Sequence, residues 1–373
     1  MTLEKRRVTV SVISDLVSDQ RVHRVCTFLQ ENGFEIALIG RRNNKSLLPD
    51  QRNYSIHRIR CYFNKGVMKY AEFNWKLFIK LLFKKTDMLL SNDLDTLVPN
   101  FIISKLRRKK LVYDTHEYFT GMPELQNKPI RRRIWKTIEK IILPRIKKVY
   151  TVSESVANQY EKDYGVKLQV IRNTPILNSS LQNREDDILP KGKTILLLQG
   201  SGINKDRGAE ELIESMTLLP DNFLLVLIGG GECWEGLKSL TLKLNLKDKV
   251  MFIEKVPFEE LKKYTSQAYL GFSLDKPTNL NYRLSLPNKI FDYIHAGVPI
   301  VASEITEVKK ILETYQVGTA IPDVTPQTIA AAVLSVFKNQ QLYERWKQNT
   351  TKATEDLCWQ KEQLALKEIF KVV

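Results

Sequence analysis

Residues 281–303 read NYRLSLPNKIFDYIHAGVPIVAS. Pro287 suits the first turn of a helix, and Ser285 just before it is a plausible N-cap. Gly297 is the usual signal that a helix ends, and the apolar run at 299–303 is typical of a buried strand. The stretch therefore predicts a helix that leads directly into a strand, the connection from which parallel α/β sheets are built.

The predicted helix has two different faces. Leu286, Ile290 and Ile294 recur every four residues, so they form the stripe that should pack on the sheet. Lys289 and Asp292 lie three apart and share another face. If that face meets a ligand, Lys289 can pair with a phosphate and Asp292 can accept hydrogen bonds from a ribose diol. The alternative is an ordinary surface pair, which composition alone favours.

The same alternation of strand and helix continues along the whole chain. Helical periodicity is clear at 21–33 and at 209–219, for example. Short apolar strands that alternate with helices predict parallel sheets covered on both faces. The runs that we expect to be strands are 8–14, 35–40, 88–91, 110–116, 148–153, 168–173, 194–200, 223–229, 249–254, 269–274 and 299–303.

A chain of 373 residues is too long for one ordinary hydrophobic core and has the length expected of two domains. The polar stretch at 176–193 is the best boundary because it carries Asn, Ser and Asp clusters. Two doubly wound α/β lobes predict a ligand cleft between them, at the carboxyl ends of their strands. The predicted domains are an N-terminal Rossmann-like lobe at 1–178, a linker at 179–193, a second Rossmann-like lobe at 194–345, and a helical segment at 346–373 that packs back toward the first lobe.

The composition is that of a soluble globular protein, with 43% hydrophobic and 27% charged residues. The four cysteines lie far apart, without the spacing of a disulfide framework or a zinc site, which suits a reducing compartment. The first residues fit a β-strand better than a signal peptide, and no apolar run reaches the ~18 residues that a membrane span needs. We therefore expect a cytoplasmic protein.

The net charge of +16 is unevenly placed. Residues 1–180 contain 34 Lys and Arg against 17 Asp and Glu, whereas the rest contains 24 against 25. Basic amphipathic helices predicted at 76–85 and 128–148, with Trp75 and Trp135 beside them, could rest on the anionic cytoplasmic face of a membrane. The alternative is that these are solvated helix faces and that the charge serves solubility. Nucleic acid is not expected as a partner, because no known binding module appears.

Two glycine-containing turns follow strands in the second half. In LLLQGSGINKDRG, Gly200 and Gly202 let the backbone approach a ligand, and the helix that opens near Gly208 directs free N–H groups there. Arg207 could add a charge-assisted fork to a phosphate. The three glycines at 229–231 fit either a ligand contact or a sharp turn alone. Neither a G-x-G-x-x-G motif nor a P-loop occurs in the chain.

A set of segments carries a family signal. In the second half they read LLLQGSGINKDRG (196–208), LVLIGGGE (225–232), DKVMFIEKVPFEELKKYTSQAYLGFSL (248–274) and SLPNKIFDYIHAGVPIVAS (285–303). Weaker segments in the first half are SDQRVHRVCTFLQENGFEIALIGR (18–41), NDLDTLVP (92–99), VYDTHEYF (112–119), VYTVSESVANQY (149–160) and VIRNTP (170–175). In order and spacing, and over nearly the whole chain, they resemble the group 1 glycosyltransferases of the two-lobed GT-B architecture.

The resemblance implies transfer of a sugar, with retention, from a nucleoside diphosphate sugar on the second lobe to a saccharide or lipid-linked glycan acceptor on the first. Such a reaction serves the biosynthesis of surface polysaccharides or glycoconjugates. The nucleotide-sugar is a substrate, and no cofactor or metal ion is expected. The family's ribose-binding acid aligns with Asp292, and its diphosphate-binding basic pair aligns with Arg207 and Lys289. The chain departs from the family at Leu284, where an acid is usual, and at Ser201, where an arginine is usual.

Backbone groups around Ser285 and Leu286 can take over the sugar contact of the missing acid. The predicted donor-binding residues are therefore Gly200, Ser201, Gly202, Arg207, Gly230, Ser285, Leu286, Lys289 and Asp292.

His116 follows a buried strand, in the position that cleft residues occupy. By resemblance it would lie near the donor sugar and the acceptor, and we expect it to be catalytic; a core histidine is the alternative. Asp93 and Asp95 end the preceding strand in the same way, and with Glu117 they are expected to bind the acceptor. The other histidines lack this context and are expected to be structural.

Two other classes of function remain open. A degenerate GT-B scaffold subunit without activity is suggested by Leu284 and Ser201, and activity of the purified chain would discriminate against it. A sugar-nucleotide epimerase on the same architecture would convert the donor without any acceptor.

Overall fold

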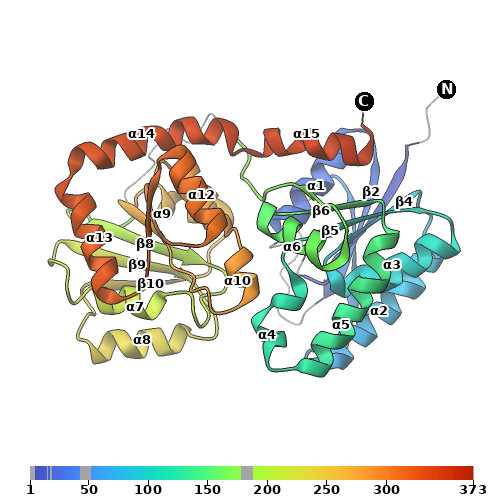
Figure 1. Cartoon of the computed structure of the whole chain (residues 1–373), viewed down its shortest axis with the longest axis horizontal. Coiled ribbons are helices and arrows are strands. Elements are labelled where there is room, and N and C mark those ends of the chain that lie inside the picture. The colour runs from blue at the N-terminus through green and yellow to red at the C-terminus, as the bar shows by residue number, and fades with distance from the viewer. Residues whose placement is uncertain (1–4, 15, 17–18, 43–51, 178–187, 373) are drawn as a thin grey trace. The chain divides into compact units, whose positions relative to one another are not determined.

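The computed structural model describes residues 5–14, 16, 19–42, 52–177 and 188–372. The chain divides into two compact units, Met1–Arg172 with Gln363–Val373, and Asn173–Glu362 (Figure 1). Most of the predicted linker, residues 179–187, lies outside the described residues. Among the described helices, none combines the length and the apolar character that crossing a bilayer requires.

The first unit is built on a parallel sheet of seven strands in the order β3-β2-β1-β4-β5-β6-β7. Its strands are β1 (Arg7–Ser11), β2 (Glu35–Arg42), β3 (Ser55–Arg60), β4 (Met88–Asn92), β5 (Lys110–Thr115), β6 (Lys148–Thr151) and β7 (Gln169–Val170). After the edge strand β3 the chain returns to place β4 beside β1, so the strand order reverses there. Open α/β sheets bind ligands at the carboxyl ends of strands near such a switch point.

Local signals fix the ends of the helices in the first unit. Asp19 caps α1 by accepting a hydrogen bond from the Val22 amide. Ser153 caps α6 in the same way, and Gly165 ends that helix in the left-handed conformation. The helices are α1 (Gln20–Glu31), α2 (Gly66–Phe83), α3 (Leu94–Leu106), α4 (Pro123–Gln126), α5 (Pro129–Ile142), α6 (Glu154–Tyr164) and most of α15 (Trp359–Phe370), which begins in the second unit, with short helical turns η1 (Phe119–Gly121) and η2 (Leu143–Arg145).

The second unit contains a parallel sheet of six strands in the order β10-β9-β8-β11-β12-β13. The strands are β8 (Thr194–Gly200), β9 (Phe223–Gly229), β10 (Val250–Glu254), β11 (Leu270–Ser273), β12 (Ile300–Ser303) and β13 (Gly318–Ile321). The helices are α7 (Ala209–Ser215), α8 (Trp234–Lys243), α9 (Phe258–Thr265), α10 (Leu280–Leu284), α11 (Asn288–His295), α12 (Thr306–Tyr315), α13 (Pro326–Lys338) and α14 (Gln340–Asp356). Here the strand order reverses between β8 and β11.

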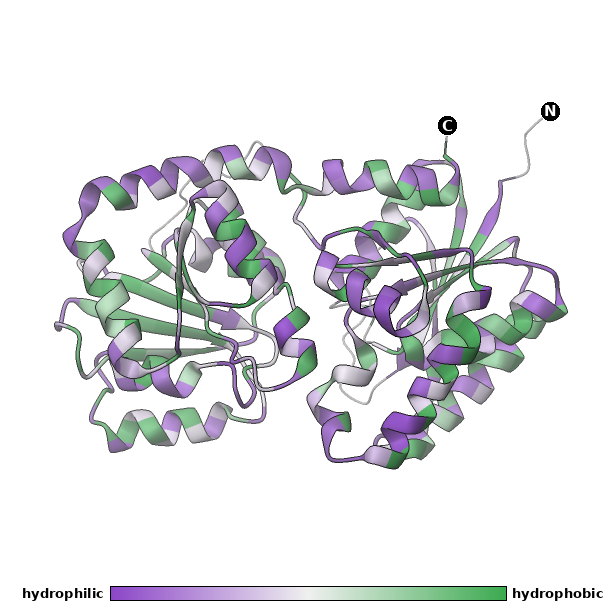
Figure 2. Cartoon of the chain, viewed as in Figure 1, coloured by the Kyte–Doolittle hydropathy of each residue, from purple (hydrophilic) through white to green (hydrophobic). Residues whose placement is uncertain are grey.

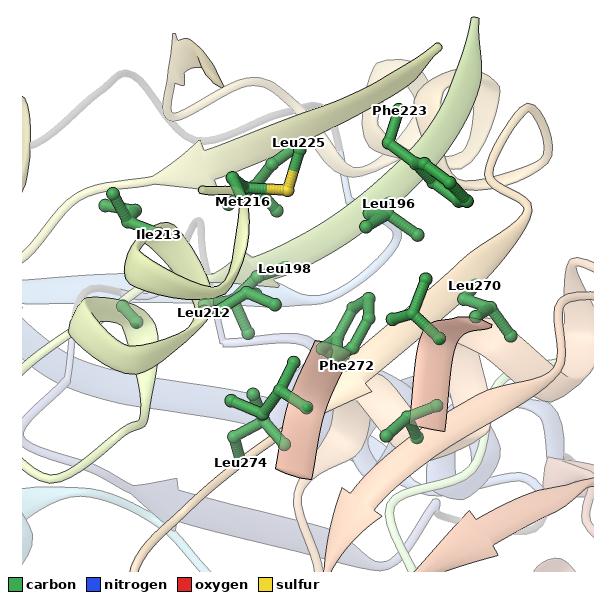
Figure 3. Packing of buried hydrophobic residues seen from close by; sticks show 14 of the residues in the cluster. Leu196, Leu198, Leu212, Ile213, Met216, Phe223, Leu225, Leu270, Phe272 and Leu274 are labelled. Carbon is green, nitrogen blue, oxygen red and sulfur yellow. The ribbon is translucent and has the colours of Figure 1, made fainter. Parts of the chain in front are cut away.

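The central strands of the second sheet are covered on both faces. On one face, Leu198 and Phe272 belong to the same apolar cluster as Leu212 of α7 (Figure 3). On the other face, Leu197 packs in a cluster with Ile290 of α11. Strands of this kind read as continuous apolar runs, and Figure 2 shows the strands of this sheet as hydrophobic ribbons. All the runs that we expected to be strands contain one, and β3 and β13 come in addition.

Candidate active site

Asp93, Asp114 and His116 meet at the carboxyl ends of β4 and β5. The His116 backbone amide donates to Asp93 Oδ1 over 2.9 Å. Nδ1 of the ring lies 3.2 Å from Asp93 Oδ2, and Nε2 lies 3.3 Å from Asp114 Oδ2. Asp93 holds this position with a φ of 57°, in the left-handed region that non-glycine residues rarely adopt. Backbone strain of this kind concentrates at functional sites.

Asp114 is held from the other side by Arg21 of α1. Both side chains are buried, and Arg21 Nε and Nη2 donate to the two carboxylate oxygens over 2.9 and 2.8 Å. Arg21 Nη1 donates to the carbonyl of Ile171 over 2.8 Å. Burial alone would raise the pKa of Asp114, but Arg21 and His116 outweigh it and hold this pKa at about 2. Asp114 is therefore a permanent anion beside His116.

The two carboxylates keep His116 protonated. Burial would lower the pKa of His116, but attraction to Asp93 and Asp114 exceeds this effect and raises the pKa to about 10. At neutral pH the ring is therefore an imidazolium, which cannot accept a proton as a general base. It can instead supply a positive charge and N–H donors.

Asp95 lies in the first turn of α3 and is buried. Burial, and then the charge of Asp93, raise its pKa well above the usual value, while Lys69 and His116 act in the opposite direction. Burial also raises the pKa of Asp93, against the attraction of His116. Glu117 contributes to the same electric field. The structure thus gathers these expected residues in one cluster, and acceptor binding by them stays a prediction.

In the second unit, two cations share one buried carboxylate. Arg207 Nη1 donates to Asp275 Oδ2 over 2.7 Å, and Asp275 is fully buried. The Arg207 guanidinium also lies over the ring of Tyr282, 4.3 Å from its centroid. Burial lowers the pKa of the half-buried Lys289; Asp275 opposes this shift, and Arg207 adds to it. Asp275 therefore lies in the electric field of two cations, Arg207 and Lys289.

Helix α11 carries Lys289 and Asp292. Its Tyr293 fixes the helix to the sheet through the side-chain hydroxyl. The Tyr293 hydroxyl lies 3.1 Å from the carbonyl oxygen of Leu197 and 3.3 Å from the amide of Gln199. Nε2 of Gln199 in turn donates to Asp292 Oδ2 over 3.2 Å. The end of β8 therefore orients the carboxylate that the sequence assigned to ribose.

Ser285 does not cap α11, so that expectation is wrong. Its hydroxyl donates to the carbonyl of Tyr282 over 2.9 Å, and Pro287 occupies the cap position of α11. The reason is the short helix α10, which ends at Leu284: Ser285 is its C-cap, and the hydroxyl bonds back to that helix. Leu286 is buried in the core. Because this side chain is buried, the donor contact predicted for Leu286 is limited to its main chain.

Two of the three glycines at 229–231 are explained by one turn packing on another. Gly229 and Gly231 both have a φ of 143°, and a Cβ on Gly229 would lie 1.8 Å from the carbonyl oxygen of Gly200. A sharp turn therefore accounts for Gly229 and Gly231. A Cβ on Gly230 would meet only the side chain of Lys255, at 3.2 Å, so the donor contact expected of Gly230 stays a prediction. A Cβ on Gly200 or Gly202, by contrast, would meet its nearest neighbour at 3.8 or 3.6 Å, an ordinary contact. Internal packing therefore does not require glycine at these two positions, and close approach of a ligand there stays a prediction.

Four residues of these clusters were missed by sequence reasoning, although a signal for them exists. Asp114 and Gln199 each interrupt a strand that is otherwise apolar, and Asp275 directly follows one. Arg21 stands on the face of α1 that also buries Val22 and Val25. A charged or amide group at a core-facing position must find a partner, which marks it as a member of a network.

Comparison with known proteins agrees with these features. The family described as "Glycosyl transferases group 1" matches residues 182–353, and the "Glycosyltransferase Family 4" description matches residues 19–174. The O-antigen chain mannosyltransferase RfbU of Salmonella typhimurium is 26% identical over 227 residues, which cover 57% of this chain and 61% of RfbU. The chain thus aligns with less than two thirds of the length of this relative.

Two solved structures show the same fold over the full length. Sucrose-phosphate synthase from Thermosynechococcus elongatus superposes with a TM-score of 0.79 at 16% identity, covering 98% of both chains. HepE of Anabaena, solved in complex with UDP-glucose, superposes with a TM-score of 0.74 at 14% identity, covering 98% of this chain and 100% of HepE. The fold is GT-B, and by its two matched segments the chain belongs to the group 1 glycosyltransferases.

Proposed function

We propose that this chain transfers a sugar from a nucleoside diphosphate sugar to a saccharide or lipid-linked glycan. The product would belong to a surface polysaccharide or glycoconjugate. The observation that carries the proposal is the pair of cations, Arg207 and Lys289, around the buried Asp275 at the carboxyl ends of parallel strands. Support comes from RfbU, named as an O-antigen mannosyltransferase, and from HepE, which was solved with UDP-glucose.

On the donor side, the diphosphate would lie against Arg207 and Lys289, with the open backbone at Gly200 and Gly202 beside it. Negative charge develops on this leaving group as the bond to the sugar breaks, and fixed cations stabilise it. Asp292, already oriented by Gln199, would accept hydrogen bonds from the ribose diol. The contacts expected of Ser201, Gly230 and Ser285 belong to the same proposal.

On the acceptor side, the His116 imidazolium would supply charge and hydrogen bonds rather than remove a proton. Its partner Asp93, which His116 holds in place, would orient the acceptor hydroxyl together with Asp95 and Glu117. Retention of configuration is part of the proposal, through same-face attack in which the leaving phosphate assists. This route asks for no cofactor or metal ion.

The test starts with thermal unfolding in the presence of uridine, guanosine, adenosine and cytidine diphosphates. A nucleotide at about 100 times its Kd should add about 2.7 kcal/mol of stability. The matching nucleotide-sugar is then incubated with lipid-linked saccharides, and released diphosphate and extended glycan are measured. The double variant Arg207→Ala/Lys289→Ala should lose both signals, while Lys243→Ala/Lys247→Ala, at exposed positions of the same unit, should keep them.

The outcomes separate the functions. Nucleotide binding without any turnover would point to the scaffold subunit. Conversion of the donor to a second nucleotide-sugar without acceptor would point to the epimerase. Failure to bind any nucleoside diphosphate would contradict both the transferase and the epimerase.

We further propose that the first unit docks on the anionic cytoplasmic face of a membrane. The basic surplus lies within residues 1–180, and α2 and α5 expose both cations and large apolar side chains there. Each Lys or Arg near such a surface contributes about 1 kcal/mol, so a handful suffices for reversible attachment. The chain should sediment with anionic vesicles at low salt, leave them at high salt, and ignore zwitterionic vesicles. Absence of binding at low salt would refute the docking.

A further inference from the structure

A cationic groove lies along α4 and α5 of the first unit. Its volume is about 360 Å³, within the range of small-molecule sites. The groove is lined by Arg132, Arg133, Lys136, Lys140 and the hydroxyl-bearing Thr137. The side chains come from successive turns of one helix, so the groove is built by a rigid element.

None of the groove's four cations forms an ion pair within the described parts of the chain. The only acid in α5 is Glu139, which is buried and accepts hydrogen bonds from Tyr160 and Tyr164. Elsewhere, partly exposed lysines do find acids: Lys238 pairs with Glu235, for example.

Spacing sharpens the contrast. Arg132, Lys136 and Lys140 are each four residues apart, so like charges stack on adjacent turns, which destabilises a helix. A bound polyanion would turn this repulsion into attraction. Arginine forks in particular match phosphate oxygens bidentately.

An apolar stripe borders the groove on the same helix. Ile130, Ile134 and Ile141 are 77%, 55% and 51% exposed, unusual values for isoleucine. Thr137 follows Ile134 by three residues and precedes Ile141 by four, so it lies in the stripe and also lines the groove. A ligand that fits both surfaces has a polyanionic head and a hydrocarbon tail.

The groove is tied to the segment that follows His116. Arg132 Nε donates to the carbonyl of Thr120 over 3.0 Å, and Thr120 is four residues beyond His116. A chain of four residues spans at most about 14 Å, so the backbone at the groove edge is within that distance of the His116 backbone. A head group in the groove could therefore present an attached saccharide to the His116 cluster.

We propose that this groove binds the diphosphate of a lipid-linked acceptor. The inference rests on the proposed function, because it names the acceptor's anchoring group. A phosphomonoester carries about −1.5 to −2 charge near neutral pH, and a diphosphate at least as much, whereas a diester head group carries about −1. The groove's concentrated charge therefore favours the diphosphate over bulk membrane phosphodiesters.

The test compares binding of the full chain to two kinds of phosphatidylcholine vesicle. One contains a long-chain polyprenyl diphosphate, and the other contains phosphatidylglycerol at the same total surface charge. The groove variant is Arg133→Ala/Lys136→Ala/Lys140→Ala, which leaves the Arg132 bond in place. The control removes three exposed lysines from the second unit: Lys243→Ala/Lys247→Ala/Lys338→Ala.

The wild type and the control should bind the diphosphate vesicles more tightly than the charge-matched ones. The groove variant should lose about a hundredfold on the diphosphate vesicles, because ~1 kcal/mol per cation corresponds to about fivefold each. Lys140→Gln alone should lose about fivefold, which guards against a folding defect in the triple variant. Inorganic pyrophosphate should compete in the wild type.

Equal binding to both vesicles, or a preference that survives in the groove variant, would overturn the inference. Nucleoside diphosphate binding, measured on the same preparations, keeps this result separate from the proposed function. If nucleotide binding persists in every variant while the vesicle preference is absent, only the groove assignment fails. If nucleotide binding is absent as well, the donor assignment fails with it.

Discussion

Replacement of Asp93 by Asn should lower the pKa of His116 by about 2 units. The ring has two carboxylate partners at nearly equal distances, 3.2 and 3.3 Å, and together they raise its pKa from 6.5 to about 10 against burial. One of the two should therefore account for about half of the rise, within the 1–3 units that a close opposite charge contributes. A fall of about 2 pKa units means that the charged form of His116 loses about 2.7 kcal/mol of stabilisation relative to the neutral form, at ~1.36 kcal/mol per pKa unit.

The sign of the pH dependence follows from the direction of the shift. The folded-state pKa of His116 is raised, so the imidazolium stabilises the folded unit fully below pH ~6.5 and loses this effect as the pH rises to about 10. In Asp93→Asn the loss should be complete near pH ~8. Native-state hydrogen exchange of β5 amides, corrected for intrinsic rates, measures this difference.

The pKa itself is measured by NMR titration of ring-labelled histidines. Comparison with His116→Gln assigns the signal, and the other histidines serve as internal controls. A wild-type His116 that titrates near 6.5 would refute the reasoning. So would an Asp93→Asn variant in which its pKa does not move.

Three further predictions concern other groups. Arg207→Ala and Lys289→Ala should each weaken binding of a nucleoside diphosphate at least about tenfold, as loss of a charged hydrogen bond does, and leave free nucleoside binding unchanged in calorimetry; equal losses for both ligands would contradict the phosphate contact. Asp292→Asn should cost about 1.5–3 kcal/mol of donor affinity, and a deoxyribose donor should lose little more on that variant; a ribose preference that persists in Asp292→Asn would speak against the role. Burial raises the pKa of Glu139 from 4.5 to about 7, so the folded state loses stability as the pH rises through that window. Glu139→Gln should therefore raise the free energy of unfolding at pH ~8 by up to about 3 kcal/mol and change it little at pH ~4.5, as chemical denaturation can show.

The strands of this fold were largely predictable, for a physical reason. A parallel strand under two helix layers must be apolar on both faces, and such runs stand out in a sequence. The edge strand β3 escaped because its two isoleucines, Ile56 and Ile59, stand three apart among polar and charged residues and so lack the alternation of a half-buried strand. The strand β13 escaped because four residues, GTAI, carry too little pattern.

The sequence predicts the site residues that follow strands, but not the buried ion pairs behind them. His116 and Asp93 follow strands, so topology alone places them at a ligand-binding edge. Which carboxylate pairs with which cation depends on three-dimensional packing, so the Arg21–Asp114 and Arg207–Asp275 pairs were not predicted. The role of Ser285 was not predicted for the same reason: its hydroxyl bonds to a five-residue helix, which is too short to show a periodic pattern in the sequence.

The buried Asp275 has a consequence for turnover. If a diphosphate binds Arg207 as proposed, it would have to compete with this carboxylate, so part of its attraction would go into breaking an existing 2.7 Å pair. In a transferase, Asp275 would also act after the reaction, because it would pair with Arg207 again as the nucleoside diphosphate product leaves. Slow release of product limits many enzymes. Asp275 would therefore lower the affinity for the nucleoside diphosphate and speed its release. The Asp275→Asn variant should release the nucleoside diphosphate product more slowly.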